Sequence, residues 1–322
     1  MFSRKIYGVG ETVYDILFRN GNPLKAVPGG SAFNALITLG RCGLSPVLST
    51  FVGDDPIGRL TLDFMQRNGV DTGYVEIRKN SKSHLSLAFL NEVNDAEYVF
   101  YKDHASLSVE LTLPTFLPGD YLLFGSFFAI NPVIRPQMLR YLSAAVHAGA
   151  TLYYDINFRP SHLKDLPAVK EHVLENIRLS SVVRGSMEDF HCLFGVDNDC
   201  PDRYALAADI YHRHLKGECP YLLVTDGARA VHVLTPVRHL VFEVAPISTV
   251  STVGAGDNFN AGIVYFMSRQ GITKADLVEL SDEVWAQMVH TAQRFSACVC
   301  QSLDNYVNEK FVVTLRGRDA TV

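Results

Sequence analysis

Short apolar segments alternate with amphipathic ones along most of this chain of 322 residues, and this alternation constrains the fold more than any other feature. A strand followed by a helix and then another strand is the repeating unit of a parallel sheet. We predict buried strands at 5–9, 47–52, 121–125, 151–156, 182–183 and 221–225, and a hairpin at 230–244. Helices are expected at 32–42, from the end of the segment 53–58 to about 68, at 135–148 and at 168–178. Further helices are expected from the end of the segment 184–188 to about 215 and at 282–303. The sequence therefore predicts an α/β fold with a mainly parallel central sheet.

The alternation breaks between residues 73 and 106. Apolar and polar side chains alternate at 85–89 and again at 98–100, and the turn-like segment 91–95 separates them, which is typical of an antiparallel hairpin. With residues 12–28, this hairpin is expected to form a small inserted β-sheet over the carboxyl ends of the parallel strands, where open α/β sheets bind ligands. We interpret this small sheet, at about 12–28 and 73–106, as a lid.

The composition is that of a globular protein, with 48% hydrophobic and 20% charged residues, so the disordered and fibrous classes are excluded. A formal net charge of -5 gives no electrostatic reason to expect nucleic acid or an anionic membrane as a partner. Residues 1–7 enter a strand pattern without the apolar region of a signal peptide, and no apolar run reaches membrane-spanning length. We expect a cytoplasmic protein with reduced cysteines and a single domain over residues 1–322.

The segment 251–259, STVGAGDNF, places two glycines at the start of an apolar helical run. The first turn of a helix carries unpaired N–H donors and partial positive charge, and Gly254, Ala255 and Gly256 are small enough for a phosphoryl oxygen to approach them. In that first turn, Asp257 could simply complement the helix dipole. Beside a bound phosphate it could instead take a proton from an attacking hydroxyl. The segment alone leaves both interpretations open.

Polar residues also follow two other strands. Asp155, Asn157 and Arg159 lie two positions apart, so a continuing strand would point all three side chains to one face. The segment 184–188, RGSME, is expected to form a polar turn after the short strand before it. Both places are candidates for ligand contacts.

Two glycine segments together resemble the two signatures of the PfkB, or ribokinase-like, carbohydrate kinases. The early one is 29–35, GGSAFNA, in which Ser31 is expected to cap a helix, and the late one is 252–259, TVGAGDNF. The segments 53–58, GDDPIG, and 224–227, VTDG, lie between them, and the resemblance covers nearly the whole chain. It implies a three-layer ribokinase-like sandwich with a β lid. It also implies transfer of the γ-phosphoryl group of ATP to a sugar hydroxyl, with Mg²⁺ as cofactor.

The resemblance assigns roles to single residues. Asp257 matches the base that receives the hydroxyl proton, and the amides of Gly254, Ala255 and Gly256 match the anion hole. The sugar side is matched by Asp15, Gly29, Gly30 and Asn34, the nucleotide side by Thr225, Gly227, Gly254 and Gly256, and a water-mediated magnesium contact by Glu188. Taken singly, the same residues would be interpreted as a surface carboxylate, a helix-cap environment or an ordinary turn.

Two positions depart from the family pattern. The family motif Asn-x-x-Glu keeps only Glu188, because residue 185 is glycine, so the magnesium geometry is left open. Ser251 stands where many relatives have an acidic residue that helps to hold a monovalent cation, and potassium activation is therefore not assumed.

The segments 155–159 and 100–102 resemble the branch that contains the fructokinases and the 2-keto-3-deoxygluconate kinases. Arg159 could hold a substrate carboxylate, lie near the ATP phosphates or pair with a structural acid. Sugar-acid kinases tend to present Tyr and Arg from the lid, where this chain has Tyr101 and Lys102, so we expect a neutral ketose such as fructose. Asn157 and Arg159 are expected to contact it, and a sugar acid is the alternative.

A function of another class is a regulatory protein that binds sugar or nucleotide without turnover. The intact segment 254–257 argues against it, whereas Gly185 and Ser251 leave it open. A homodimer formed through the lid would be compatible with the resemblance.

Overall fold

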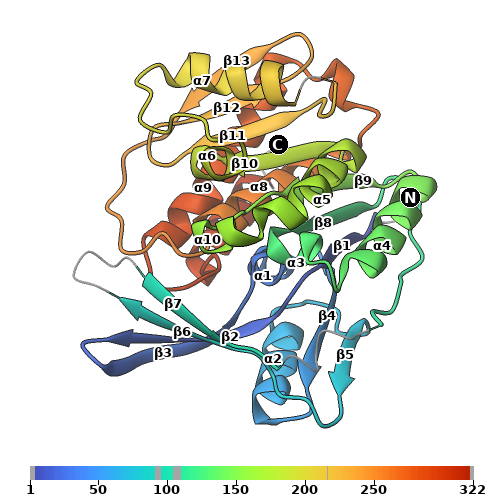
Figure 1. Ribbon diagram of the computed structural model, residues 1–322, viewed down its shortest axis with the longest axis vertical. Coiled ribbons are helices and arrows are strands. Elements are labelled where there is room, and N and C mark those ends of the chain that lie inside the picture. Colours follow the sequence, from blue (N-terminus) through green and yellow to red (C-terminus); the bar gives the residue numbers. More distant parts are fainter. Residues whose placement is uncertain (1–3, 91–95, 104–109, 216, 320–322) are drawn as a thin grey trace. The chain divides into compact units, whose positions relative to one another are not determined.

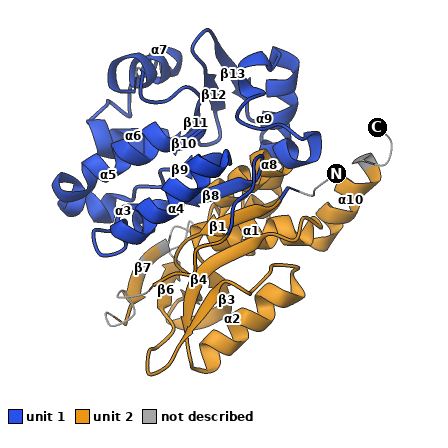
Figure 2. Ribbon diagram, turned by 90° about the vertical axis from the view of Figure 1, so that its right-hand side faces the viewer, with its two compact units in different colours: residues 1–4, 115–246, 266–293 blue, residues 5–114, 247–265, 294–322 orange. Residues whose placement is uncertain are grey.

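The computed structural model describes residues 4–90, 96–103, 110–215 and 217–319 (Figure 1). These residues form two compact units (Figure 2). Unit 1 comprises residues 1–4, 115–246 and 266–293, and unit 2 comprises residues 5–114, 247–265 and 294–322. The expectation of a single domain over residues 1–322 stays a prediction.

Unit 2 contains part of the large, mainly parallel sheet. Its strands are β1 (Ile6–Val9), β4 (Val47–Gly53) and β5 (Val75–Arg78), in the order β1-β4-β5, and both neighbouring pairs are parallel. All side chains of β1 and β4 are buried, as expected of parallel strands with both faces covered. Helix α1 (Ser31–Arg41) packs on β1 and β4, and α2 (Pro56–Arg67) packs on β4.

The second sheet of unit 2 is the small one predicted from the change in alternation. Its order is β3-β2-β6-β7, with β2 and β6 parallel and the other two pairs antiparallel. Asn20 and Gly21 both have positive φ, which is the conformation of a two-residue turn that joins the strands of a β-hairpin. The predicted turn at 91–95 and the end of the lid at 104–106 lie outside the described residues. The strands are β2 (Val13–Arg19), β3 (Asn22–Gly29), β6 (Leu85–Leu90) and β7 (Ala96–Tyr101).

Three further α-helices of the described residues begin within or after the late glycine segment. They are α8 (Ala255–Gln270), α9 (Asp282–Cys300) and α10 (Glu309–Asp319), and residues 255–265, 294–300 and 309–319 of them belong to unit 2. The prediction of a helix to residue 303 was too long, because α9 ends at Cys300. Helix α10 was not predicted. No helix among the described residues combines the length and the hydrophobicity needed to cross a lipid bilayer.

Unit 1 contains the other strands of the large sheet, in the order β13-β12-β11-β10-β9-β8. Strands β8 to β11 pair in parallel, whereas β11, β12 and β13 pair antiparallel, which confirms the predicted hairpin and the α/β fold class. The strands are β8 (Tyr121–Gly125), β9 (Thr151–Asp155), β10 (Val182–Ser186), β11 (Leu222–Asp226), β12 (Ala230–Leu234) and β13 (His239–Glu243). The main helices are α3 (Ser126–Ile130), α4 (Arg135–Ala148), α5 (Leu166–Leu179), α6 (Met187–Phe194) and α7 (Arg203–Asp209).

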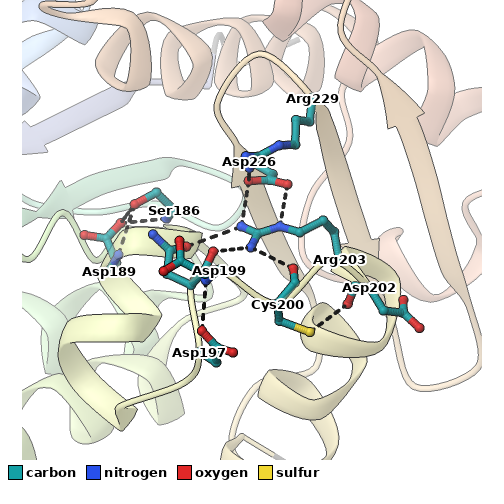
Figure 3. Close-up of polar contacts among 10 residues, drawn as sticks. Ser186, Asp189, Asp197, Asp199, Cys200, Asp202, Arg203, Asp226 and Arg229 are labelled. Carbon is teal, nitrogen blue, oxygen red and sulfur yellow. Dashed lines mark hydrogen bonds and ion pairs between the residues drawn. The ribbon is translucent and has the colours of Figure 1, made fainter.

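The predicted polar turn at 184–188 was wrong. Arg184, Gly185 and Ser186 complete β10, and α6 begins at Met187. The Ser186 hydroxyl accepts a hydrogen bond from the Asp189 amide at 3.1 Å, and the Asp189 carboxylate accepts one from the Ser186 amide at 2.6 Å (Figure 3). This reciprocal capping box starts α6 directly after the strand, so no separate turn is needed.

Gly185 cannot easily be replaced by the asparagine of the family motif. A Cβ at this position would lie 2.7 Å from the Phe190 ring and 3.1 Å from Ile156 Cδ1. We expect Gly185→Asn to lower the free energy of unfolding by about 1–3 kcal/mol, the usual cost of overpacking a buried site, as measured by urea denaturation. The matched control is Gly195→Asn, because Gly195 has φ 67° and open space around its Cα, and asparagine tolerates that conformation. Equal stability of the two variants would contradict the steric explanation.

Candidate active site

The candidate site of unit 2 is built from the first turns of α1 and α8. Asp257 lies in the first turn of α8 and is 9% exposed. Its Oδ1 accepts a hydrogen bond from the Ser31 hydroxyl at 2.8 Å, and its Oδ2 accepts one from Asn34 Nδ2 at 2.8 Å. Ser31 and Asn34 are three residues apart on α1, so they present their side chains on the same face. The two glycine segments, more than 200 positions apart in the chain, thus meet at one carboxylate.

Ser31 does not cap α1 as the sequence predicted. Gly30 occupies the cap position without a side-chain hydrogen bond, and Ser31 is the first residue of the helix. Gly30 has φ 127°, and a Cβ there would lie 2.4 Å from the Glu11 carbonyl oxygen, so only glycine fits. The Ser31 hydroxyl is therefore available to donate to Asp257. This role was missed because the acceptor comes from a distant segment.

The turn before α8, residues 252–255, differs in one detail from the predicted anion hole. Gly254 has φ 77°, and the Asn258 amide donates to its carbonyl oxygen at 2.9 Å, so the helix starts directly after it. The Ala255 amide donates to the Thr252 carbonyl oxygen at 3.2 Å, so it would have to leave this acceptor before it could bind an anion. Gly256 lies in the first turn, where helix N–H groups have no intrahelical acceptor. The shared anion-binding role of Gly254, Ala255 and Gly256 stays a prediction.

The buried side chain of Asn258 holds this turn in place, a role that the sequence did not predict. It is fully buried, and its Nδ2 donates to the carbonyl oxygens of Gly254 and Asn305, both at 2.8 Å. Its Oδ1 accepts from the Thr38 hydroxyl of α1. A buried amide with all these partners holds its surroundings in one conformation, so the segment before Asp257 is rigid.

Asp15 lies on β2 and is 8% exposed. Asn305 Nδ2 donates to its Oδ2 at 3.4 Å, and a Cβ on Gly29 would lie 2.2 Å from the same oxygen. Gly29 therefore lets the carboxylate pack directly against the backbone. Burial raises the pKa of Asp15 to about 7, and the nearby charge of Asp257 acts in the same direction. A second carboxyl group thus lies close enough to Asp257 to interact with it electrostatically.

Glu11 joins the small sheet to the end of β1, and sequence analysis did not single it out. His84 Nδ1 contacts its Oε1 and Lys102 Nζ contacts its Oε2, each at 2.7 Å. Burial alone would raise the pKa of Glu11, but the hydrogen bonds from His84 and Lys102 hold it below its ordinary value. The neighbouring Tyr101 lies at the end of β7 with 57% of its surface exposed.

The sequence prediction for Asp155, Asn157 and Arg159 was wrong. Strand β9 ends at Asp155, and Asn157 has φ 41°, which breaks the extended alternation that would have aligned the three side chains. Asp155 is buried in an ion pair with Arg184, with 3.0 Å between Oδ1 and Nη1. Arg159 is exposed. The three side chains therefore do not form one strand face.

A network of arginines fixes the region of Thr225 and Gly227 in unit 1. Arg184 Nη2 donates to the Thr225 hydroxyl at 2.6 Å. Arg203 binds both carboxylate oxygens of Asp226 with its Nε and Nη2, each at 2.8 Å (Figure 3). Such a bidentate pair holds both partners in one orientation.

The same network sets the charge and the geometry of the turn that follows. Arg229 Nη1 adds a third contact to Asp226 at 2.9 Å. Although burial would raise the pKa of Asp226, its arginine partners hold it below the ordinary value. Gly227, next in the chain, has φ 53°, and a Cβ added there would meet no atom of the described residues within 4 Å. The turn predicted to contact the nucleotide is therefore held at Asp226 by Arg203 and Arg229, and it has open space at Gly227.

The described residues do not supply a full set of protein ligands for magnesium. Glu188 is exposed in the first turn of α6, and Gly185 offers no side-chain ligand. Within residues 4–90, 96–103, 110–215 and 217–319, no three His, Cys, Asp or Glu side chains are grouped to hold a metal ion. The hydroxyl of Ser251, the position at which the resemblance led us to look for an acid, accepts a hydrogen bond from the Val253 amide at 3.2 Å. The water-mediated role of Glu188 stays a prediction.

The buried carboxyl group of Asp15 predicts a pH-dependent stability. Its pKa in the folded chain is above its ordinary value of 3.8, so folding loses stability as the pH rises from about 4 to about 7. Asp15→Asn removes this cost, and we expect the variant to exceed the wild type by roughly 1–4 kcal/mol at pH 8 and by little at pH 4.5. Urea denaturation at both values measures the difference, with the exposed carboxylate variant Asp54→Asn as control. A stability difference between Asp15→Asn and the wild type that is the same at both pH values would contradict the burial argument.

Comparisons with known proteins agree with this geometry. A model of the pfkB family carbohydrate kinases matches residues 5–308. The chain is 26% identical over 306 residues to a fructokinase of Escherichia coli, which covers 93% of this chain and 97% of the relative. Two solved structures share the fold at low identity. One is aminoimidazole riboside kinase from Salmonella enterica complexed with aminoimidazole riboside and an ATP analog, with a TM-score of 0.81 at 21% identity over 98% of this chain and 99% of that one.

The other is fructokinase from Vibrio cholerae O395 in its fructose, ADP and calcium ion bound form, with a TM-score of 0.80 at 20% identity over 97% of this chain and 98% of that one. Both likenesses confirm the ribokinase-like fold that the two glycine segments predicted. The family match extends over both of those segments and over Glu11, Asp15 and Asn305 as well. The chain therefore belongs to the pfkB family of carbohydrate kinases and is a sugar phosphotransferase.

Proposed function

We propose that this kinase transfers the γ-phosphoryl group of ATP to a hydroxyl group of a neutral ketose, with fructose as the first candidate. The observation that carries the proposal is the contact of Asp257 with Ser31 and Asn34. It holds a carboxylate in a fixed orientation at the positive end of α8, where a phosphoryl group is also attracted. A base and an anion site side by side are what phosphoryl transfer to an alcohol requires.

In the proposed reaction, Asp257 takes the proton of the sugar hydroxyl while the hydroxyl oxygen attacks the γ-phosphorus. A bond forms between that oxygen and phosphorus, and the bond from phosphorus to the bridging oxygen breaks, which leaves ADP. The hydrogen bonds from Ser31 and Asn34 keep the carboxylate aimed at the hydroxyl. Amides at the start of α8, that of Gly256 among them, stabilise negative charge on the transferred oxygens.

The sugar side offers hydrogen-bond acceptors, which suit the donors of a polyhydroxyl substrate. Asn34 uses its Nδ2 for Asp257, whereas its Oδ1 is buried and has no hydrogen-bond partner among the described residues. A buried carbonyl oxygen without a donor is costly, and a substrate hydroxyl would supply one. Asp15 adds a carboxylate that, when ionised, accepts hydroxyl donors in the same unit. Gly29 lets the backbone approach the Asp15 carboxylate, and Gly30 lets it approach the Glu11 carbonyl group.

Charge favours a neutral ketose over a sugar acid. Asp15, Asp257 and Glu11 all belong to unit 2 and would repel a substrate carboxylate. Lys102, a candidate cation of the lid, is bound to Glu11 at 2.7 Å and is therefore not offered to a ligand. Tyr101 is exposed beside it and is the proposed lid contact. That curated relatives include fructokinases supports the same substrate class.

On the nucleotide side we propose Thr225 and Gly227 as contacts of ATP. Their turn is held by Arg184, Arg203 and Arg229, and it needs little ordering when a nucleotide binds. We expect magnesium to arrive with the ATP phosphates, and Glu188 is the candidate water-mediated contact. No step above depends on the ion.

The substrate is tested by ADP release over a panel of fructose, ribose, 2-keto-3-deoxygluconate and aminoimidazole riboside. We expect the highest kcat/KM with fructose.

The variant Arg159→Lys should change KM for fructose and for the sugar acid to the same extent, because in this proposal the guanidinium group of Arg159 does not hold a substrate carboxylate. A KM for the sugar acid that rises more than about tenfold while that for fructose does not would instead identify a sugar-acid kinase. Absence of ADP release with every member of a broad C5 and C6 panel would contradict the proposed function.

A further inference from the structure

The segment Asp304 to Val307 lies between α9 and α10, outside both glycine segments, and its residues bond to several elements of unit 2. The Tyr306 hydroxyl donates to the Pro28 carbonyl oxygen of β3, and the Val307 amide donates to the Thr38 hydroxyl of α1 at 3.2 Å. Lys25 of β3 forms an ion pair with Asp304. The segment therefore connects the small sheet to α1.

Asn305 lies at the centre of this segment and is only 2% exposed. Its Nδ2 donates to Asp15 Oδ2 at 3.4 Å, and its carbonyl oxygen accepts from Asn258 Nδ2 at 2.8 Å. A Cβ on Gly254 would lie 3.0 Å from that carbonyl oxygen, and a Cβ on Gly29 would lie 3.5 Å from Nδ2. One buried residue thus contacts the carboxylate of the sugar side and the turn before α8.

The two contacts have different physical effects. A donor placed against a buried carboxylate favours its ionised form and fixes which oxygen faces the ligand. The contact through Asn258 supports the backbone of the turn that carries Asp257 and does not depend on the side chain of residue 305. Truncating that side chain therefore removes the first contact and leaves the second in place.

We propose that Asn305 is a positioning residue of the sugar side, whose side-chain amide holds the Asp15 carboxylate in its ionised, hydroxyl-accepting orientation. Its consequence for catalysis rests on the proposed function, but its effect on Asp15 does not. Among the described residues, Asp257 of α8 and Tyr306 of the same segment are titratable groups that interact electrostatically with Asp15. Ser86 lies opposite Asp15 in the pairing of β2 with β6. Substitution of Asn305 changes none of these three residues.

The direct test is the titration of the Asp15 carboxyl carbon by NMR in the protein without ligand, with Asp15→Asn to assign the signal. We expect Asn305→Ala to move the midpoint upward by about 0.5–1 pH unit, the worth of one modest hydrogen bond to a charged group. The control Asn308→Ala removes the exposed asparagine that directly follows this segment and caps α10 through the Phe311 amide, and it should leave the midpoint unchanged. An unmoved midpoint in folded Asn305→Ala would overturn the proposal. If that variant does not fold, Asn305→Ser is measured with the same expectation.

The kinetic arm uses the best sugar of the wild-type panel. We expect Asn305→Ala to raise KM for the sugar about 3- to 10-fold, to shift the pH dependence of KM upward with the Asp15 midpoint, and to change kcat less. A merely structural role would lower the melting temperature without moving the pH dependence, and that result would also overturn the proposal. Should the wild type phosphorylate no sugar, the proposed function fails, while the titration still decides the role of Asn305.

Discussion

The hydrogen bonds that join Asp257 to Ser31 and Asn34 are the interaction on which the candidate site depends. They connect the first turns of α1 and α8, and each helix begins there because a glycine with positive φ, Gly30 or Gly254, precedes it. A carboxylate at the start of a helix would by itself be an ordinary dipole partner. Two side-chain donors from another helix turn it into an oriented group, as the proposed base requires.

Around this contact, buried amide side chains do the positioning. Asn258 holds the turn before α8, Asn34 contacts Asp257, and Asn305 contacts Asp15. Amides suit this work because each offers donors and an acceptor without adding charge beside two carboxylates. In unit 1 the same task falls to arginines, since Arg184 and Arg203 there face Asp155 and Asp226.

Sequence alone predicted most of the fold, because buried parallel strands appear as apolar runs and the small sheet is marked by strict alternation. It also selected Asp257 and Asn34 as site candidates, though only through two segments recognised together, and these two side chains are in contact in the structure. The errors have different causes. Ser31 donates to Asp257, an acceptor that no local pattern contains, and the positive φ of Asn157 ends the extended alternation after β9. At 184–188 the signal was local, because Ser186 and Asp189 form a capping box at the start of α6. Asn305 has no local signal, because its partners Asp15 and Asn258 lie far from it in the chain.

The central claim is that Asp257 acts as the base, and single-turnover kinetics on Asp257→Asn tests it most directly. Asparagine keeps the shape, and the Ser31 hydroxyl can accept from its amide while the amide oxygen still accepts from Asn34. We predict a rate of phosphoryl transfer reduced roughly 10²–10⁴-fold, with sugar and ATP affinities and melting temperature close to those of the wild type. A folded Asp257→Asn protein that transfers the phosphoryl group at nearly the wild-type rate would contradict the account.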